Sequence, residues 1–215
     1  MTMKRKLIFI GNSIVAGYPW SKGKSFPSII RRALKGDCEE IPQPAFGRSL
    51  GFEIVNKGVN GDTTAGILGR FSEDVLDHSP DMVFIMTGTN DFIYRDATPR
   101  EAMDNLVQMA ALLEASGGKT ILLTPIPVDA GKAEFMWMAG CGISYPAVNR
   151  DIAELSDLIA ESGIDYLDLG GAFAKYASSF DDPDLVYLDG IHPMPEGHVF
   201  MAETIIDYLK EEFEK

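Results

Sequence analysis

The chain of 215 residues is poor in cysteine, histidine and basic side chains. Its two cysteines, Cys38 and Cys141, are too few for a disulfide framework and suit a reducing compartment. With 19 Lys and Arg against 32 Asp and Glu, the formal net charge is −13. Because such a surface repels a phosphate backbone, nucleic acid is not expected as a partner.

Long hydrophobic runs are also missing. The basic N-terminus is followed by only one short apolar run, Leu7–Ile10, before Gly11. That run is too short for the core of a signal peptide, and no other segment approaches the roughly 18 apolar residues of a membrane helix. We therefore expect a cytoplasmic protein without a membrane span.

Short apolar segments alternate with longer amphipathic segments along the chain. Continuous apolar runs of this length are typical of parallel strands that are covered on both faces. The predicted strands are Leu7–Ile10, Phe52–Asn56, Met82–Met86, Thr120–Leu123 and Ile164–Leu167. The alternation predicts a single three-layer α/β domain over residues 1–215, with right-handed crossovers.

Local signals mark the ends of several helices. Thr98-Pro99-Arg100-Glu101 is a capping box with proline at the first helical position, and Gly117-Gly118 should end that helix. Another helix is expected over Ser25–Leu34, and an apolar stripe from Val199 to Phe213 predicts a last one.

Four polar clusters follow strands or precede the last helix. They are Gly11-Asn12-Ser13, Asn56 to Asp62, Gly88 to Asp91, and Asp189 to Pro193. In an open parallel sheet, ligands bind beyond the carboxyl ends of the strands. We therefore expect the four clusters to meet at one edge of the sheet.

Ser13 and His192 are the residues of these clusters best suited to nucleophilic catalysis. Ser13 lies at a strand-to-helix turn, where its hydroxyl can be exposed and its N–H can bind an anion, although serine is also a common helix cap there. His78 and His198 are weaker candidates for the base, because they are expected at a helix end and inside the last helix. Asp189 can reach Nδ1 of His192 and orient the ring.

Gly61 and Asn90 are candidates for binding an oxyanion. Glycine lets the backbone approach a ligand closely, and the Asn90 amide can donate a hydrogen bond to a developing charge. Each residue also has a purely structural interpretation, a tight turn for Gly61 and an Asx turn for Asn90. Asp62 is expected to cap the helix that follows.

Together the four clusters resemble the SGNH hydrolases, the GDSL-like lipase/acylhydrolase family. The matching segments are Gly11–Gly17, Asn56–Thr63, Gly88–Asp91 and Asp189–Pro193, in the order and spacing of the family across essentially the whole chain. The resemblance implies a flavodoxin-like three-layer sandwich with a five-stranded parallel sheet. It also implies a serine esterase that works through an acyl-enzyme intermediate.

The resemblance also implies a role for each matching position. Ser13 would be the nucleophile, His192 the general base and Asp189 its orienting acid. The oxyanion donors would be the N–H groups of Ser13 and Gly61 and the side-chain amide of Asn90.

Two positions depart from the family pattern. Asn12 stands where the family usually has aspartate, so a charge at this position is not expected to be essential. Met194 stands where asparagine is frequent, so Pro195 should start the last helix with less support.

The expected substrate is a small carboxylic ester or thioester, hydrolysed without a metal or other cofactor. The sequence has no HExxH and no paired Cys or His at ligand spacing. Short acyl groups are favoured, and carbohydrate acetyl esters and lysophospholipids stay open as alternatives.

An apolar substrate pocket is expected from two segments, one after Asn90 and one over residues 135–138. Its predicted members are Phe92, Ile93, Met136 and Trp137, with Tyr94 beside them. The alternative is that these residues complete the core or bury the interface of a homo-oligomer.

Three competing functions stay open. The first is a cysteine nucleophile at Cys141, which has no base near it in the sequence. The second is a flavodoxin-like binding module, although the chain lacks GxGxxG after its first strand and lacks a GxxxxGK[ST] loop. The third is acyl transfer to an acceptor other than water.

Overall fold

The computed structural model describes residues 4–20, 23–41, 51–137 and 142–213. In these residues five parallel strands form one sheet in the order β2-β1-β3-β4-β5. The strands are β1 (Arg5–Gly11), β2 (Phe52–Gly58), β3 (Met82–Met86), β4 (Lys119–Leu123) and β5 (Tyr166–Leu167). The predicted α/β fold with a five-stranded parallel sheet is confirmed. β5 begins two residues later than expected, because only Tyr166 and Leu167 pair with β4.

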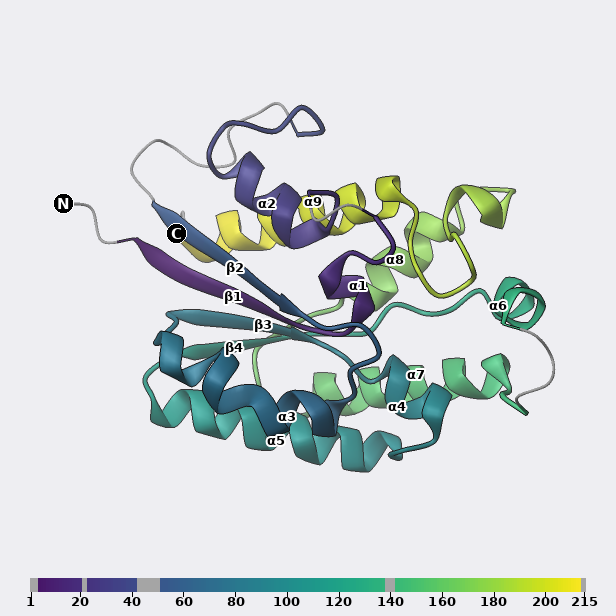
Figure 1. Ribbon diagram of the computed structural model, residues 1–215, viewed down its shortest axis with the longest axis horizontal. Coiled ribbons are helices and arrows are strands. Elements are labelled where there is room, and N and C mark those ends of the chain that lie inside the picture. Colours follow the sequence, from purple (N-terminus) through teal and green to yellow (C-terminus); the bar gives the residue numbers. More distant parts are fainter. Residues whose placement is uncertain (1–3, 21–22, 42–50, 138–141, 214–215) are drawn as a thin grey trace.

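Helices cover both faces of the sheet (Figure 1). One face carries α2 (Phe26–Ala33), α8 (Leu169–Ala177) and α9 (Pro195–Phe213), and the other carries α3 (Thr64–Asp74), α5 (Pro99–Ala115) and α7 (Tyr145–Glu161). Side chains of β1 alternate between the two cores, with Leu7 and Phe9 in one and Ile8 and Ile10 in the other. This alternation explains why the strand is apolar at every position.

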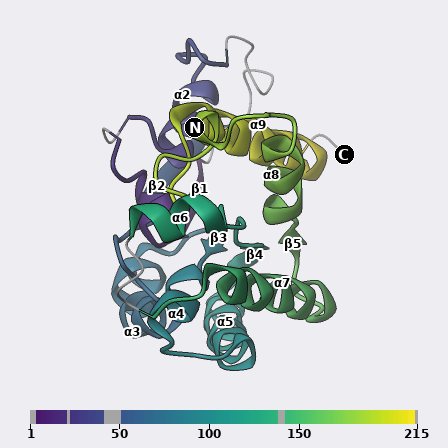
Figure 2. The same ribbon diagram turned by 90° about the vertical axis from the view of Figure 1, so that its right-hand side faces the viewer.

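Shorter elements lie at the carboxyl edge of the sheet or link the larger ones. They are α1 (Ser13–Ala16), α4 (Thr89–Tyr94), α6 (Ala130–Met136), and the 3₁₀ turns η1 (Leu76–His78) and η2 (Pro183–Leu185). Figure 2 looks onto the carboxyl ends of the strands and shows α6 crossing in front of the sheet. In the part of the chain that the structure describes, no helix is long and apolar enough to cross a membrane.

Of two helix caps predicted from the sequence, the structure contains one and not the other. The capping box of α5 is present, because the Thr98 hydroxyl accepts from the Glu101 N–H and the Glu101 carboxylate accepts from the Thr98 N–H. The prediction that Asp62 caps α3 is wrong. Thr63 is the cap, and the Asp62 carboxylate is instead drawn to the guanidinium of Arg70 on the next turns of the helix.

Candidate active site

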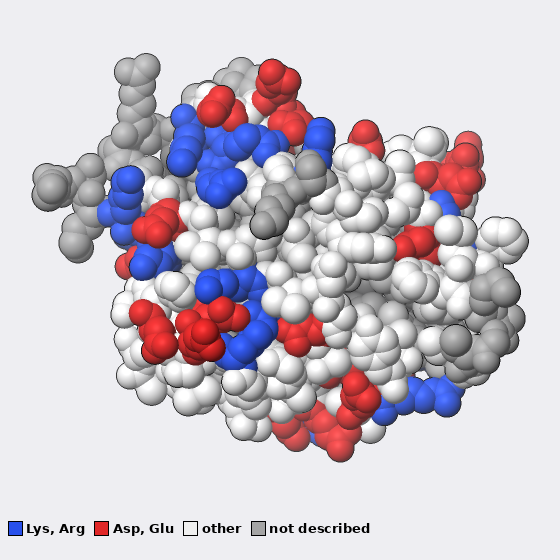
Figure 3. Space-filling model, viewed as in Figure 1, with Lys and Arg blue, Asp and Glu red and all other residues white. Residues whose placement is uncertain are grey.

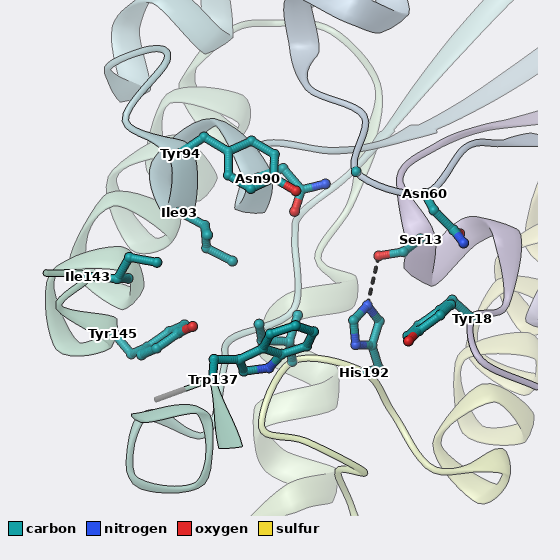
Figure 4. Close-up of a pocket in the computed structure, with 12 residues that line it drawn as sticks. Ser13, Tyr18, Asn60, Asn90, Ile93, Tyr94, Trp137, Ile143, Tyr145 and His192 are labelled. Atoms are coloured by element: carbon teal, nitrogen blue, oxygen red, sulfur yellow. Dashed lines mark hydrogen bonds between the residues drawn. The ribbon is translucent and has the colours of Figure 1, made fainter. Parts of the chain in front are cut away.

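The four polar clusters meet at the carboxyl edge of the sheet, around a pocket of about 290 Å³ (Figure 4). Ser13 follows β1, Gly61 follows β2, Asn90 follows β3, and His192 lies in the turn before α9. The lining residues are Ser13, Tyr18, Asn60, Gly61, Asn90, Ile93, Tyr94, Trp137, Ile143, Tyr145, Ile191 and His192. Residues that are almost 180 positions apart in the sequence therefore share one cavity.

Ser13, His192 and Asp189 form a hydrogen-bonded series. The Ser13 Oγ lies 2.9 Å from His192 Nε2, and His192 Nδ1 lies 2.7 Å from Asp189 Oδ2. The three residues are only 7%, 6% and 6% exposed. A hydroxyl, an imidazole and a carboxylate in this order allow the imidazole to accept the hydroxyl proton.

The Asp189 carboxylate is held in its ionised form. Its Oδ1 accepts hydrogen bonds from the N–H groups of Ile191, at 3.0 Å, and His192, at 2.8 Å. Burial by itself raises the pKa of Asp189, but the hydrogen bonds from the ring and backbone of His192 hold that pKa below its usual range. An ionised Asp189 keeps the proton of the neutral ring on Nδ1, so that Nε2 faces Ser13 as an acceptor.

The backbone around Ser13 frees its hydroxyl. The interpretation of Ser13 as a helix cap is wrong, because Asn12 is the cap of α1 and its Oδ1 accepts from the Ile14 N–H at 3.0 Å. The amide of Asn12 therefore caps α1 without a carboxylate. Glycine is needed just before it, because a Cβ at Gly11 would lie 2.1 Å from the Met86 carbonyl oxygen where β1 packs closely against β3.

Three residues with potential oxyanion donors line the pocket, each after a different strand. Gly61 has φ of +79°, which favours glycine, and neither its N–H nor that of Ser13 donates to another described residue. The Nδ2 group of Asn90 donates to the Asp62 carbonyl at 2.9 Å, which fixes the amide with a second N–H available. Together these groups can surround a developing negative charge.

Asp91 directly follows Asn90 and joins α4 to α3. Its buried carboxylate accepts from the Thr64 N–H, at 3.0 Å, and from the Thr64 hydroxyl, at 2.5 Å. Burial raises the pKa of Asp91 above its usual range. Asp91 does not line the pocket, and its contacts assign it to the support of the neighbouring Asn90.

The predicted apolar pocket is found in part. Ile93, Tyr94 and Trp137 line it, whereas Phe92 and Met136 do not. In α4 the side chain of Phe92 turns into the core on one face of the sheet, while the next two residues face the pocket. On α6 the Met136 side chain is half exposed outside the pocket, and the following residue, Trp137, faces His192 at a ring distance of 6.4 Å.

Several lining residues are not predicted by the sequence. They are Tyr18, Asn60, Ile143, Tyr145 and Ile191. Asn60 and Ile191 belong to the polar clusters already singled out, so their neighbours could have indicated them. No local pattern marks the other three. The alternative nucleophile Cys141 lies outside the described residues.

The remaining buried histidine, His198, is not connected to the series. Neither ring nitrogen has a partner among the described residues, and the ring stacks on Phe26 at 6.2 Å. Burial lowers the pKa of His198 to about 3, so the ring is neutral near pH 7.

The described residues also include no group of three or more His, Cys, Asp or Glu that could hold a metal ion.

A serine, a histidine and an aspartate in this order, beside unpaired N–H groups, define a serine hydrolase of α/β architecture. The model of the GDSL-like Lipase/Acylhydrolase family matches residues 9–200, and the chain belongs to that family. The resemblance seen in the sequence is confirmed, and the protein is a carboxylic ester hydrolase.

Named relatives agree with this class. An arylesterase of Vibrio mimicus is 27% identical over 95% of this chain and 88% of its own length. An acetylxylan esterase of Geobacillus stearothermophilus is 27% identical over 94% of this chain and 92% of its own length. The crystal structure of a lipase/acylhydrolase from Enterococcus faecalis superposes with a TM-score of 0.74 at 23% identity, over 97% of this chain and 96% of that one, and so shares the fold.

Proposed function

We propose that this esterase hydrolyses small, uncharged carboxylic esters or thioesters with Ser13 as nucleophile. His192 is the general base, and Asp189 orients its ring. The observation that carries the proposal is the 2.9 Å contact between Ser13 Oγ and His192 Nε2, at the wall of a pocket that also holds Gly61 and Asn90.

The first half of the reaction forms an acyl-enzyme. The Ser13 hydroxyl proton passes to His192 Nε2 while Oγ attacks the carbonyl carbon of the ester. The carbonyl oxygen becomes an oxyanion, which accepts hydrogen bonds from the N–H groups of Ser13 and Gly61 and from the Asn90 amide. Loss of one such donor typically costs about 3–4 kcal/mol of transition-state stabilisation. His192 then gives its proton to the leaving alcohol or thiol as the carbonyl re-forms.

The second half repeats these steps with water. His192 takes a proton from the water, the hydroxide oxygen attacks the acyl carbon, and Ser13 leaves with the proton returned by His192. The products are a carboxylic acid and the free enzyme. An acceptor other than water would give a new ester instead, so detection of the free acid separates hydrolysis from acyl transfer.

The composition of the pocket supports an uncharged, apolar acyl or aryl group. Its lining includes no Lys, Arg, Asp or Glu among the described residues. On the side away from His192, Figure 4 shows Ile93, Tyr94, Ile143 and Tyr145, with Trp137 between them and the histidine. A volume of about 290 Å³ suits a short acyl chain or a single aromatic ring.

A carbohydrate acetyl ester is the second candidate. Tyr18 and Asn60 lie on the other side of Ser13 and provide polar groups that can bind sugar hydroxyls (Figure 4). The relative named as an acetylxylan esterase supports this alternative. An acetylated xylooligosaccharide therefore belongs in the same substrate panel.

The test is a panel of p-nitrophenyl esters from acetate to decanoate, run on the wild type, on Ser13→Ala and on Ser178→Ala. Ser178 is an exposed serine at the end of α8 and serves as the matched control. We expect Ser13→Ala to lose activity by at least about 10⁴-fold on every ester, because the nucleophile is absent. Near-normal turnover by a folded Ser13→Ala would overturn the proposal. Inactivation by a serine-directed phosphonate but not by iodoacetamide would separate Ser13 from a cysteine nucleophile.

A further inference from the structure

We propose that Arg70 is a positioning residue that sets the relative placement of the three oxyanion donors. It acts through an ion pair with Asp62 and through contacts with the ends of β1 and β2. The proposal rests on the proposed function, because it assumes that Ser13, Gly61 and Asn90 bind the oxyanion.

Arg70 joins α3 to two strand ends. Its side chain is 20% exposed, and its Nε lies 2.7 Å from Asp62 Oδ2. Its Nη2 donates to the carbonyl of Lys57 in β2, at 2.9 Å, and more weakly to that of Gly11 in β1, at 3.4 Å. Nη1 pairs with Asp74 at 2.5 Å. The rigid fork of a guanidinium can hold several acceptors in a fixed arrangement, which a lysine cannot do.

Asp62 connects this cation to the third donor. Its carboxylate faces Arg70, while its own carbonyl accepts the Asn90 amide at 2.9 Å. It also directly follows Gly61 in the chain. A Cβ at Gly66 would lie 2.1 Å from Asp62 Oδ1, so glycine in α3 leaves room for the carboxylate. One residue therefore contacts the guanidinium with its side chain and the Asn90 amide with its backbone.

The strand ends are joined to one another in the same place. The Gly11 carbonyl, two residues before Ser13, accepts the Val59 N–H at 3.0 Å as well as the Arg70 contact. Figure 3 shows acidic and basic side chains in contact over the region between β2 and α3. Ion pairs of Arg70 with Asp62 and Asp74 and of Lys57 with Asp74 form a charge cluster between these two elements. Through Asp62 this charge cluster directly follows Gly61 in the chain, but none of its residues lines the pocket.

The position of the donors decides how well they act. Donors from three separate strand ends must converge on one oxygen, and a displacement of about 1 Å can reduce turnover about 100-fold. Arg70 contacts the ends of β1 and β2 directly and reaches Asn90 through Asp62. A partly exposed ion pair with no such role would contribute little to stability and nothing to turnover.

The first experiment compares Arg70→Met with Arg32→Met in steady-state kinetics and thermal unfolding. Arg32, which is on α2 and away from the pocket, forms a similar, partly exposed ion pair with Glu40. We expect Arg70→Met to lower kcat about 10- to 100-fold with little change in KM, because the donors act mainly on the transition state. Arg32→Met should keep the wild-type kcat.

Two further variants guard against misfolding and test the chemistry of the pair. Asp62→Asn keeps the backbone and size but weakens the pair, and we expect kcat to fall about tenfold. Arg70→Lys should recover part of the loss, because an ammonium can pair with Asp62 but cannot also reach the Lys57 and Gly11 carbonyls.

A trifluoromethyl ketone provides a second readout. The Ser13 oxygen adds to its carbonyl carbon, the hydroxyl proton moves to His192, and the carbonyl oxygen becomes an oxyanion. We expect its affinity to fall in Arg70→Met in parallel with kcat/KM, while the affinity for the alcohol product stays the same. A wild-type kcat and wild-type ketone affinity in folded Arg70→Met and Asp62→Asn, with Ser13→Ala inactive, would overturn only this inference. An active Ser13→Ala would overturn the proposed function itself.

Discussion

Two sides of the pocket differ in how their side chains are held. On the first side, which we call the catalytic edge, Asp189, His192 and Asn90 are at most 7% exposed, and hydrogen bonds fix each side chain. On the far wall, Tyr94 and Trp137 are 51% and 43% exposed and offer mainly apolar contacts. From this difference we expect the edge to determine the rate on any ester and the wall to determine which ester is preferred.

α6 joins the two walls. The backbone N–H of Asp129, at its start, donates to the Gly190 carbonyl at 2.8 Å, and a Cβ at Gly190 would lie 2.3 Å from the Ala133 nitrogen. Gly190 belongs to the turn that carries Asp189. Trp137 at the other end of α6 faces the pocket. The first end of α6 is therefore fixed to the catalytic turn, and its second end provides part of the apolar wall.

The largest expected effect on the edge comes from Asp189→Asn. This change keeps the size of the side chain but removes the charge that orients the His192 ring. We expect kcat to fall about 10⁴-fold. The fall should be the same for p-nitrophenyl acetate and p-nitrophenyl hexanoate, because the edge does not select the acyl group. A fall of less than tenfold, or one confined to a single ester, would contradict this division between the walls.

The next largest effect is expected from Asn90→Ala. One oxyanion donor is lost, and the Asp62 carbonyl loses its partner. We expect kcat to fall about 10²- to 10³-fold, with a small change in KM. Steady-state kinetics together with a thermal melt would distinguish the loss of this donor from unfolding of the variant. An unchanged kcat in a folded variant would show that Asn90 is not an oxyanion donor.

Much of the fold and the edge could be predicted from the sequence because both depend on short local signals. The strands are continuous apolar runs, and the clusters around Ser13, Asn90 and His192 each follow a strand or precede a helix. The carboxyl ends of parallel strands must meet at one edge of the sheet, so recognising the strands as parallel is enough to place the clusters that follow them together.

The far wall could not be predicted in the same way. Whether Phe92 or Ile93 faces the pocket depends on the rotation of α4, which six residues do not fix by periodicity. Tyr18 and Tyr145 come from segments without a motif. The pair between Asp62 and Arg70 also escaped prediction, since a local helix cap is the usual role of an aspartate at a helix start.

The two buried histidines sharpen the contrast between paired and unpaired polar groups. His192 has a partner at each ring nitrogen, whereas His198 has none among the described residues. The pKa of His198 is about 3 in the folded protein, below its ordinary 6.5. Between these two pH values the unfolded chain therefore binds a proton at His198 that the folded chain does not. The free energy of unfolding should therefore decrease as the pH falls below 6.5.

The His198→Leu variant tests this contribution by urea unfolding at pH 7 and pH 5. We expect the wild type to lose about 2 kcal/mol more than the variant between these two values. The variant should keep its esterase activity at pH 7, because His198 takes no part in the reaction. Equal losses in both proteins would contradict the lowered pKa.

The smallest effect is expected on the far wall, from Trp137→Ala. Removing the indole enlarges the space beside Ile143 and Tyr145 without touching the hydrogen bonds of the edge. We expect the ratio of kcat/KM for hexanoate to that for acetate to rise about three- to tenfold, since a half-exposed wall discriminates weakly between acyl chains. Met136→Ala is the matched control, because Met136 is also half exposed but does not line the pocket. An equal shift in both variants, or an equal loss on all esters in Trp137→Ala, would show that this wall does not select the acyl group.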